Sequence, residues 1–560
     1  MLKQSIRKDK DMYSLGIDFG TLSARAVLFD INNGKIIAQT VCEYAHGVMD
    51  EDFFGVKLPK DFALQHPQDY LDALKLTVSS VISESGIDPK EISGVGIDFT
   101  ACTLIPIKNG VPLCFYDEYS SNPHAYAKLW KHHGAAEYAA KFNSVAEKRG
   151  EAFLKLYSGN TSSEWMFPKV MEILDKAPEV YAAADTLIEA GDYIVFLLTG
   201  EMKRSICQAG FKASWNKKTG YPSKDFFREL DPRLENVVEE KLKGEICLLD
   251  KPAGRVTESG SALTGLSVGT AVAISCIDAH SALLASGICD ADKMMLIIGT
   301  SGCHIMMNDS LRYIPGICGT VEDGFVPGYH ICEAGQSCVG DHFEWFVKNC
   351  VPASYAEEAK EKGINLHKLL REKAEKLRPG ESGLIALDWF NGNRSILNDF
   401  DLSGMILGYS LRTKPEEIYR ALIEATAFGT KVILDAFERG GQEITELYAA
   451  GGIASKDPML MQIYADVTGK VIRVSDNAQA CALGSAILGS VASGAFETIQ
   501  QACKSMSQPC SKVYYPIPEN IEPYARLYSE YKLLHDYFGK GGNDVMKRLR
   551  QIPNTFQAEI

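Results

Sequence analysis

The sequence predicts an α/β protein made of two related domains. Its 560 residues are too many for a single hydrophobic core, which favours two large domains. Apolar segments of strand length alternate with longer segments of helical periodicity, and this alternation is typical of α/β architecture. A short pattern of apolar strand, Gly-Thr and second apolar strand also occurs near the start of each half of the chain. Together these features indicate two units of similar build that face each other.

The predicted strands and helices follow from local patterns. Apolar segments interrupted by glycine, threonine or serine predict strands over residues 15–29, 92–107, 271–279 and 294–307. Apolar residues repeated on one helix face predict helices over residues 67–83, 165–181, 191–198 and 416–439. Near the C-terminus, a helix is expected over 524–537, and residues 541–560 are expected to be loosely ordered.

A stretch rich in glycine, serine and threonine at residues 254–269 predicts the boundary between the two domains. The expected division is an N-terminal domain over 12–268, a C-terminal domain over 269–496, and a C-terminal extension over 497–560 that packs on the surface.

Composition and charge restrict the class of partner. The net charge is −14, and an acidic chain repels nucleic acid. No apolar run approaches the roughly 20 residues that a membrane span needs, and the charged first residues lack the apolar core of a secretory signal. The cysteines form no Cys-x-x-Cys pair, which favours free thiols in a reducing compartment. We therefore expect a cytoplasmic protein with small-molecule partners and no nucleic acid or membrane partner; a homodimer is compatible with the sequence.

The first candidate site is the segment from Asp18 to Arg25, which follows an apolar strand. Gly20 allows the backbone to approach a ligand closely, and the hydroxyls of Thr21 and Ser23 can donate to phosphate oxygens. Asp18 suits magnesium bound through water, and Arg25 can reach a phosphate or pair with a carboxylate. The competing interpretation is an ordinary hairpin turn with aspartate and glycine at favoured places.

The second candidate is Asp278, which lies at the end of an apolar strand, where α/β sheets usually carry functional groups. Transfer of a phosphoryl group to a hydroxyl needs a base that accepts the hydroxyl proton, and Asp278 can be that base. The alternative is that Asp278 only caps the helix that begins at residue 279. We expect His280, two residues on, to have a structural role.

Two further glycine-containing turns resemble nucleotide contacts. They are Gly299, Thr300 and Ser301, a candidate second phosphate turn, and Gly451, Gly452 and Ser455, where bare backbone can lie against an adenine ring. A plain connection from strand to helix explains the second turn equally well. The chain contains no P-loop motif, no protein-kinase motif set and no dinucleotide-binding fingerprint.

Taken in order, these elements resemble the family of carbohydrate kinases named for a Phe-Gly-Gly-Tyr motif. The resemblance spans about residues 13 to 495. It implies two ribonuclease-H-like domains of the actin-like ATPase fold, which flank an active-site cleft and hold the sugar mainly in the first domain and ATP mainly in the second. The chain lacks the literal Phe-Gly-Gly-Tyr string, and the usual Lys-x-x-Trp is missing because Glu172 follows three residues after Lys169.

Four passages are similar to the members of this family that phosphorylate ribulose: residues 98–103, 122–133, 162–165 and 277–280. This resemblance implies that Thr100, Ala101, Lys212, Asp278 and Glu333 line the sugar pocket, and Trp130 is expected either at its floor or in the core. The implied reaction is Mg-ATP-dependent phosphorylation of L-ribulose at O5, as in arabinose catabolism, with Asp278 as base and magnesium near Asp18 and Asp278.

Two alternatives stay open on the sequence alone. Within the family, D-ribulose, xylulose or another polyol can replace L-ribulose as substrate. From another class, an actin-like ATPase would use both phosphate turns as a conformational switch without a sugar. The polar and aromatic cluster at residues 122–133 and the carboxylate of Asp278 argue against the switch.

Overall fold

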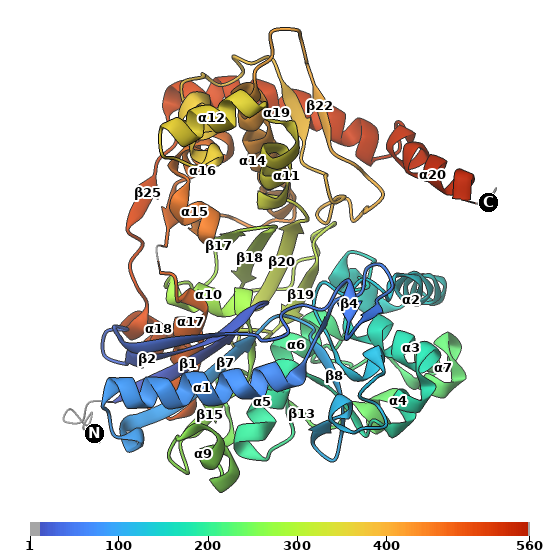
Figure 1. Cartoon of the computed structure of the whole chain (residues 1–560), viewed down its shortest axis with the longest axis vertical. Coiled ribbons are helices and arrows are strands. Elements are labelled where there is room, and N and C mark those ends of the chain that lie inside the picture. Colours follow the sequence, from blue (N-terminus) through green and yellow to red (C-terminus); the bar gives the residue numbers. More distant parts are fainter. Residues whose placement is uncertain (1–11, 476, 558–560) are drawn as a thin grey trace.

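The structure is a computed structural model that describes residues 12–475 and 477–557. Within these residues the chain forms two lobes, each built around a seven-stranded sheet. The first lobe occupies the lower part of Figure 1 and the second lobe the upper part. The α/β architecture that the sequence predicts is therefore present in both halves.

The first sheet has the order β14-β15-β7-β1-β2-β3, and β16 also pairs with β7. Its strands are β1 (Tyr13–Phe19), β2 (Ser23–Asp30), β3 (Ile36–Glu43), β7 (Ile92–Phe99), β14 (Pro252–Arg255), β15 (Ala271–Ala273) and β16 (Cys276–Ile277). Strand β1 is antiparallel to β2 and parallel to β7, and β16 is parallel to β7. The carboxyl ends of β1, β7 and β16 consequently lie at the same edge of the sheet.

The second sheet has the order β19-β20-β18-β17-β23-β24-β25. Its strands are β17 (Lys293–Ile298), β18 (Gly302–Asn308), β19 (Gly319–Glu322), β20 (His330–Gln336), β23 (Glu446–Ala450), β24 (Ile472–Val474) and β25 (Lys512–Tyr514). Strand β17 is antiparallel to β18 and parallel to β23, which repeats the arrangement of β1 with β2 and β7. The repeated hairpin pattern of the sequence thus corresponds to equivalent hairpins in the two sheets.

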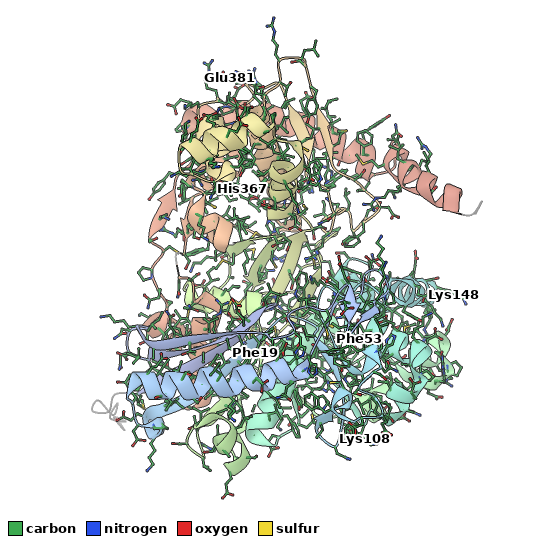
Figure 2. The ribbon with its side chains drawn as sticks, in the orientation of Figure 1. Phe19, Phe53, Lys108, Lys148, His367 and Glu381 are labelled. Carbon is green, nitrogen blue, oxygen red and sulfur yellow. The ribbon has the colours of Figure 1, made fainter. Side chains whose placement is uncertain are left out.

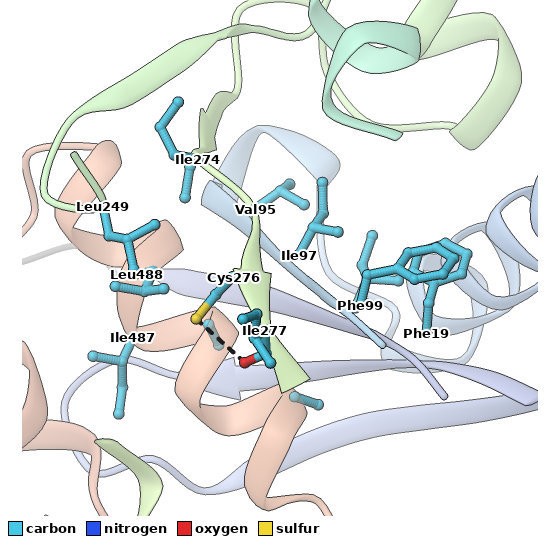
Figure 3. Packing of buried hydrophobic residues seen from close by; sticks show 14 of the residues in the cluster. Phe19, Val95, Ile97, Phe99, Leu249, Ile274, Cys276, Ile277, Ile487 and Leu488 are labelled. Carbon is cyan, nitrogen blue, oxygen red and sulfur yellow. Dashed lines mark hydrogen bonds between the residues drawn. The ribbon is translucent and has the colours of Figure 1, made fainter. Parts of the chain in front are cut away.

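Two helices that are far apart in the sequence pack on the first sheet. Helix α1 (Pro67–Ser85) packs on β2 and β3 and lies along the front of the sheet in Figure 1, whereas α17 (Ala480–Ala492) packs on β1 and β7. Figure 3 shows Ile487 and Leu488 of α17 beside Cys276 of β16. A Cβ at Gly96 would lie 1.7 Å from the Ser485 carbonyl oxygen, so glycine is required for this close contact.

A smaller sheet of the order β11-β8-β10-β6, with β9 paired to β8, extends the first lobe. Its strands are β6 (Leu64–Gln65), β8 (Leu104–Lys108), β9 (Val111–Pro112), β10 (Ala127–Lys128) and β11 (Thr186–Glu189). The helices around it are α2 (Ala136–Arg149), α3 (Met166–Lys176), α4 (Pro178–Ala183), α5 (Ala190–Thr199), α6 (Ile206–Lys212), α7 (Lys224–Leu230) and α8 (Val237–Lys241). Figure 2 marks Phe53, Lys108 and Lys148 in this region, which has an aromatic core of its own.

The helices of the second lobe enclose a separate hydrophobic core. They are α11 (Gly340–Cys350), α12 (Ala353–Glu361), α13 (Leu366–Ala374), α14 (Pro415–Arg439), α15 (Gly452–Lys456), α16 (Pro458–Thr468) and α19 (Pro518–Gly539). A two-stranded sheet of β21 (Ile385–Leu387) and β22 (Met405–Leu407) joins them, and Figure 2 marks His367 of α13 in this lobe.

Several predicted elements have different bounds in the structure. The helix expected over 165–181 is two helices, α3 and α4, because Pro178 begins a new helix and cannot continue the preceding one. The strand expected over 271–279 is two short strands, and α10 (Asp278–Ala285) begins at Asp278 itself. Asp278 is therefore the first helical residue rather than the cap, which is Ile277.

The region after the predicted boundary at residues 268 and 269 contributes to both lobes. Strands β15 and β16 join the first sheet, and α17 returns to it from the C-terminal half of the chain. In the expected extension, α18 (Ile499–Met506) packs on α17, and α19 buries Tyr524 and Tyr531 in the second core. The division at 268/269 and 496/497 stays a prediction.

The loose order expected for residues 541–560 is wrong for the part that is described. Helix α20 (Val545–Gln557) forms there, and residues 558–560 lie outside the described residues. Met546 of α20 is buried in the second core, and Lys547 pairs with Asp399 at 2.6 Å. Apolar residues at positions 545, 546, 549 and 552 have the spacing of one helix face. The two glycines just before them, at 541 and 542, favoured the prediction of loose order over that of a helix.

The fifteen cysteines all lie within the described residues and have free thiols, as the sequence predicts. None of the helices in the described part of the chain is both long enough and apolar enough to cross a bilayer.

Candidate active site

A cavity of about 320 Å³ lies between the two lobes, within the usual size range of small-ligand sites. Both lobes contribute to its lining. The predicted site residues that line it are Thr21, Thr100, Ala101, Lys212, Asp278, Gly299, Thr300, Ser301 and Glu333. The cavity lining does not include Asp18, Gly20, Ser23, Arg25, Gly451, Gly452 or Ser455. The fold thus assembles candidates from distant parts of the sequence around one space.

Three carboxylates lie where parallel strands of the first sheet end. Asp18 of β1 is paired in register with Asp98 of β7, and Asp98 is in turn paired with Cys276 of β16, two residues before Asp278. This is the edge at which α/β sheets bind ligands. The carboxyl of Asp98 is fully buried and accepts a hydrogen bond from Ser485 of α17 at 2.5 Å.

Burial of these carboxylates raises their pKa values. Burial and the neighbouring charge of Asp18 raise the pKa of Asp278 to about 7. Burial also raises the pKa of Asp18, although Arg25, with its Nε 3.4 Å from the carboxylate, acts to lower it. Burial, followed by the neighbouring charge of Asp18 as the second-largest cause, raises the pKa of Asp98 well above its usual range. Titratable groups with such shifts are typical of functional sites.

The same edge offers ligand atoms for a cation. Oxygens of Asp18 and Asp98 and the sulfur of Cys481 lie within 4.8 Å of one another. Carboxylate oxygens suit magnesium, whereas a thiol does not, so the two aspartates are the relevant part of this group. Asp278, the other predicted magnesium partner, lies outside the group.

The turn between β1 and β2 has the hairpin form that the sequence predicts. The amide of Gly20 donates to the Ser23 carbonyl at 2.9 Å. Thr21 projects toward the cavity, and its hydroxyl accepts a hydrogen bond from the indole of Trp130 at 3.1 Å. Trp130 itself lines the cavity, so it serves the pocket rather than the core alone.

The equivalent turn between β17 and β18 lies across the cavity. The Gly299 amide donates to the Ser301 carbonyl at 3.0 Å, and the Gly299 and Thr300 carbonyls accept from the amides of Gly340 and Val339. These contacts hold the turn against the start of α11. Its residues are therefore fixed with one side toward the cavity.

The glycines at 451 and 452 lie beside this second turn but outside the cavity. Gly451 follows the last residue of β23, and Gly452 is the first residue of α15; β23 is the parallel neighbour of β17. Gly451 has a φ of +107°, and a Cβ there would lie 2.4 Å from the Ile298 carbonyl oxygen, directly before Gly299. The hydroxyl of Ser455 donates to the Gly452 carbonyl at 3.3 Å.

Lys212 and Glu333 form an ion pair inside the cavity, with the ammonium nitrogen 3.5 Å from a carboxylate oxygen. Lys212 ends α6 of the first lobe, and Glu333 lies on β20 of the second. Burial opposes ionisation of both groups and is the largest single influence on each. The charge of Glu333 together with that of Glu164 nevertheless raises the pKa of Lys212, and Lys212 together with His280 and Arg394 lowers the pKa of Glu333. Both groups are therefore charged at neutral pH.

Comparison with protein-family models identifies the chain. The N-terminal domain of the FGGY family of carbohydrate kinases matches residues 13–285, and its C-terminal domain matches residues 294–493. These two matches cover most of the chain.

The chain belongs to the FGGY family of carbohydrate kinases.

Several curated proteins that are similar to this FGGY kinase over nearly its whole length are named ribulokinase. A ribulokinase of Bacillus licheniformis is 53% identical over 95% of this chain and 98% of its own length. A ribulokinase of Halalkalibacterium halodurans is 51% identical over 96% of this chain and 97% of its own. A ribulokinase of Mycolicibacterium smegmatis is 45% identical over 96% of both chains.

Solved structures of low sequence identity share the fold of this FGGY kinase. Gluconate kinase from Lactobacillus acidophilus matches with a TM-score of 0.78 at 19% identity over 95% of this chain and 99% of its own. Xylulose kinase from Rhodospirillum rubrum matches with a TM-score of 0.75 at 21% identity over 93% of this chain and 98% of its own. The expected fold of two actin-like domains flanking a cleft is confirmed.

Three residues that the structure places at the site received no individual role from the sequence, although the passages 98–103 and 162–165 include Asp98 and Glu164. Asp98 could have been found, because it ends an apolar strand in the same way as Asp18. Glu164 and Arg394 line the cavity from opposite lobes and form an ion pair at 3.3 Å. Arg394 lies in the irregular segment between β21 and β22, where no local pattern marks it.

The absence of the usual Lys-x-x-Trp pattern at Lys169 also has a structural explanation in this kinase. Lys169 of α3 is fully buried, and its ammonium donates to the carbonyls of Cys102 at 2.6 Å and Leu129 at 2.8 Å. These two residues are next to Ala101 and Trp130, which line the cavity. Lys169 therefore holds two walls of the cavity together without a tryptophan three residues later.

Proposed function

We propose that this kinase transfers the γ-phosphoryl group of ATP to O5 of L-ribulose and releases L-ribulose 5-phosphate. The observation that carries the proposal is the cavity itself, which is lined by Asp278, by the Lys212–Glu333 pair and by residues of the two turns that are expected to bind phosphate. The ribulokinases that are about half identical to this chain over nearly its full length support this substrate.

The sugar would bind on the first-lobe side of the cavity. Lys212 supplies three hydrogen-bond donors and Glu333 supplies acceptors, a combination that suits a ligand with several hydroxyls and a carbonyl. The backbone at Thr100 and Ala101 adds further donors and acceptors, and Thr100 is held to β1 by the hydrogen bond from its amide to the Phe19 carbonyl at 3.2 Å. The sugar would then have its terminal hydroxyl directed at Asp278.

Asp278 would accept the proton of that hydroxyl. A pKa of about 7 keeps a large fraction of its carboxylate ionised at neutral pH, and it remains basic enough to take a proton in the transition state. One carboxylate oxygen already accepts the Ala279 amide at 2.7 Å, which orients the group from the start of α10. The proton would leave the hydroxyl as its oxygen bonds to phosphorus.

The two turns would hold the phosphates between the lobes. Hydroxyls at Thr21, Ser23, Thr300 and Ser301 would donate to phosphate oxygens, Gly20 and Gly299 would let the backbone approach the phosphates closely, and Arg25 would add positive charge. The adenine would lie against Gly451, Gly452 and Ser455 beside the second turn. Magnesium, when bound, offsets phosphate charge, and Asp18, with Asp98 and Asp278 nearby, would hold its water shell.

The test is ADP release in a coupled assay with Mg-ATP and L-ribulose, D-ribulose, D-xylulose, glycerol or no sugar. We expect kcat/KM to be highest with L-ribulose and turnover without sugar to be negligible. Higher kcat/KM with another sugar would contradict the substrate but keep the kinase. Sugar-independent hydrolysis at the same rate would contradict sugar kinase activity. A place in arabinose catabolism and in the cytoplasm is part of this proposal, and a homodimer stays a prediction.

A further inference from the structure

His280 contacts Glu333 from behind the cavity. It lies on α10, two residues after Asp278, and its side chain is 0% exposed. Its Nε2 is 3.2 Å from Oε2 of Glu333, whereas the other oxygen of the same carboxylate, Oε1, is 3.5 Å from Lys212. Both oxygens of Glu333 therefore have a partner that belongs to the first lobe.

The other ring nitrogen of His280 is also occupied. Nδ1 is 3.1 Å from the sulfur of Cys207, which is buried on α6, the same helix that ends in Lys212. The contacts form a closed ring from Cys207 to His280, to Glu333, to Lys212 and back along α6. The ring joins α6 and α10 of the first lobe to β20 of the second.

Aromatic packing fixes the imidazole within this ring. Phe211 meets it edge to face at a centroid distance of 4.7 Å, and Phe325 does so at 6.1 Å. His280 does not line the cavity, so it has no direct route to a bound sugar. His280 can therefore affect a bound sugar only through Glu333, the cavity carboxylate that it contacts.

We infer that His280 is a positioning residue that sets the orientation of Glu333 for sugar binding. The inference rests on the proposed function, because it assigns a role relative to the same sugar. Without the contact to Nε2, the carboxylate is free to turn toward Lys212 and Arg394, the cations near it. It would then be drawn into ion pairs and would present a different oxygen to the sugar. The helix that carries the proposed base thereby also orients a carboxylate of the opposite lobe.

Two variants of equal polarity test the inference. The amide of His280→Gln can occupy the position of Nε2 and donate to Glu333, whereas the shorter amide of His280→Asn replaces Nδ1 and does not reach it. We expect H280N to raise the KM for L-ribulose about 10- to 100-fold, the usual effect of losing a hydrogen bond to a charged group. H280Q should stay within about threefold of wild type, and neither variant should change the KM for ATP by more than about threefold.

Protection against thermal unfolding by L-ribulose gives a readout that does not depend on turnover, and it should be lost in H280N and kept in H280Q. His304→Asn is the matched control, because His304 is a buried histidine of the second sheet whose Nε2 lies 3.1 Å from the hydroxyl oxygen of Thr430 and which does not line the cavity. H304N should lower the unfolding temperature without raising the sugar KM. If H280N does not fold, Cys207→Ala, which removes the contact to Nδ1 and so weakens the hold on the imidazole, should raise the sugar KM about threefold or more, and an unchanged KM would overturn the inference.

An unchanged sugar KM in a folded H280N, or equal increases in the KM for sugar and for ATP, would overturn the inference and leave the proposed function intact. Equal sugar KM values in H280Q and H280N would overturn it as well. No ribulose-dependent ADP release by the wild-type protein would instead overturn the proposed function, and the assignment of His280 with it.

Discussion

Asp278 has the two properties that a proton acceptor for a sugar hydroxyl needs. It lines the cavity, and burial together with the charge of Asp18 raises its pKa to about 7. A carboxylate with its ordinary pKa of about 4 would be ionised at neutral pH but would be a weaker base in the transition state. The shift arises because the fold buries Asp278 and also brings the ends of β1 and β16 to one edge of the first sheet.

This raised pKa predicts how activity depends on pH. The base must be ionised, so activity should be present above pH 7 and should fall as the pH decreases through about 7. We expect kcat/KM for L-ribulose, measured between pH 5.5 and 9, to rise with a slope near one and an inflection near 7. Asp278→Asn should lower kcat about 10²- to 10⁴-fold at pH 8 and keep thermal protection by ATP. A flat profile down to pH 5.5, or near-normal turnover of the variant, would contradict the assignment.

At the scale of elements, α17 connects the C-terminal half of the chain to the catalytic edge. Ser485 of α17 donates to Asp98, and Ser281 of α10 donates to the same carboxylate at 3.3 Å. The two helices touch at Gly484, where a Cβ would lie 1.8 Å from the Ser281 carbonyl oxygen. Because α10 begins with Asp278, the packing of α17 determines where the proposed base lies.

Gly484→Ala should therefore disturb both stability and catalysis. The added methyl group meets backbone that cannot move aside cheaply, so we expect a loss of about 1 to 3 kcal/mol in the free energy of unfolding. Calorimetry should show a lower unfolding temperature, and kcat should fall because α10 shifts. Gly452→Ala, also at a helical position but with open space around it, is the control and should leave the unfolding temperature unchanged or higher. Equal unfolding temperatures for the two variants would contradict this account.

At the scale of the whole molecule, charges hold the two lobes together across the cavity. Lys212 and His280 of the first lobe contact Glu333 of the second, and Glu164 of the first pairs with Arg394 of the second. Glu164 is 17% exposed and Arg394 22%, so water screens this pair in part. Such contacts favour the closed arrangement that excludes water from phosphoryl transfer.

Breaking the Glu164–Arg394 pair should weaken sugar binding more than it slows the chemical step. For Glu164→Gln we expect the KM for L-ribulose to rise about 2- to 10-fold, since a partly exposed pair contributes about 1 kcal/mol, while kcat stays within about twofold. Steady-state kinetics at low and high salt check this, because salt should raise the wild-type KM toward that of the variant. Glu229→Gln, which breaks an exposed ion pair with Arg149, should leave both parameters unchanged. An unaltered KM in E164Q would show that the pair does not contribute to closure.

The sequence by itself determined the α/β class, the repeated hairpins at Asp18 and Gly299, and the candidate base Asp278. Each of these features can be recognised from residues that are adjacent in the sequence. Strand patterns and glycine turns are local, and a carboxylate at the end of a predicted strand can be identified from the sequence alone. The predicted bounds of helices were wrong in two places. A new helix begins at Pro178 within the helix predicted over 165–181, and α20 forms where loose order was predicted.

Only the tertiary structure decided which distant residues meet. The pairing of Asp98 with Asp18, the contact of His280 with Glu333, and the ion pair of Arg394 with Glu164 join residues separated by 80, 53 and 230 positions. No local pattern encodes these contacts, because they follow from the register of parallel strands and from the approach of one lobe to the other. The same burial that creates the contacts also sets the charges, since desolvation raises the pKa of Asp278 only when the cavity encloses it.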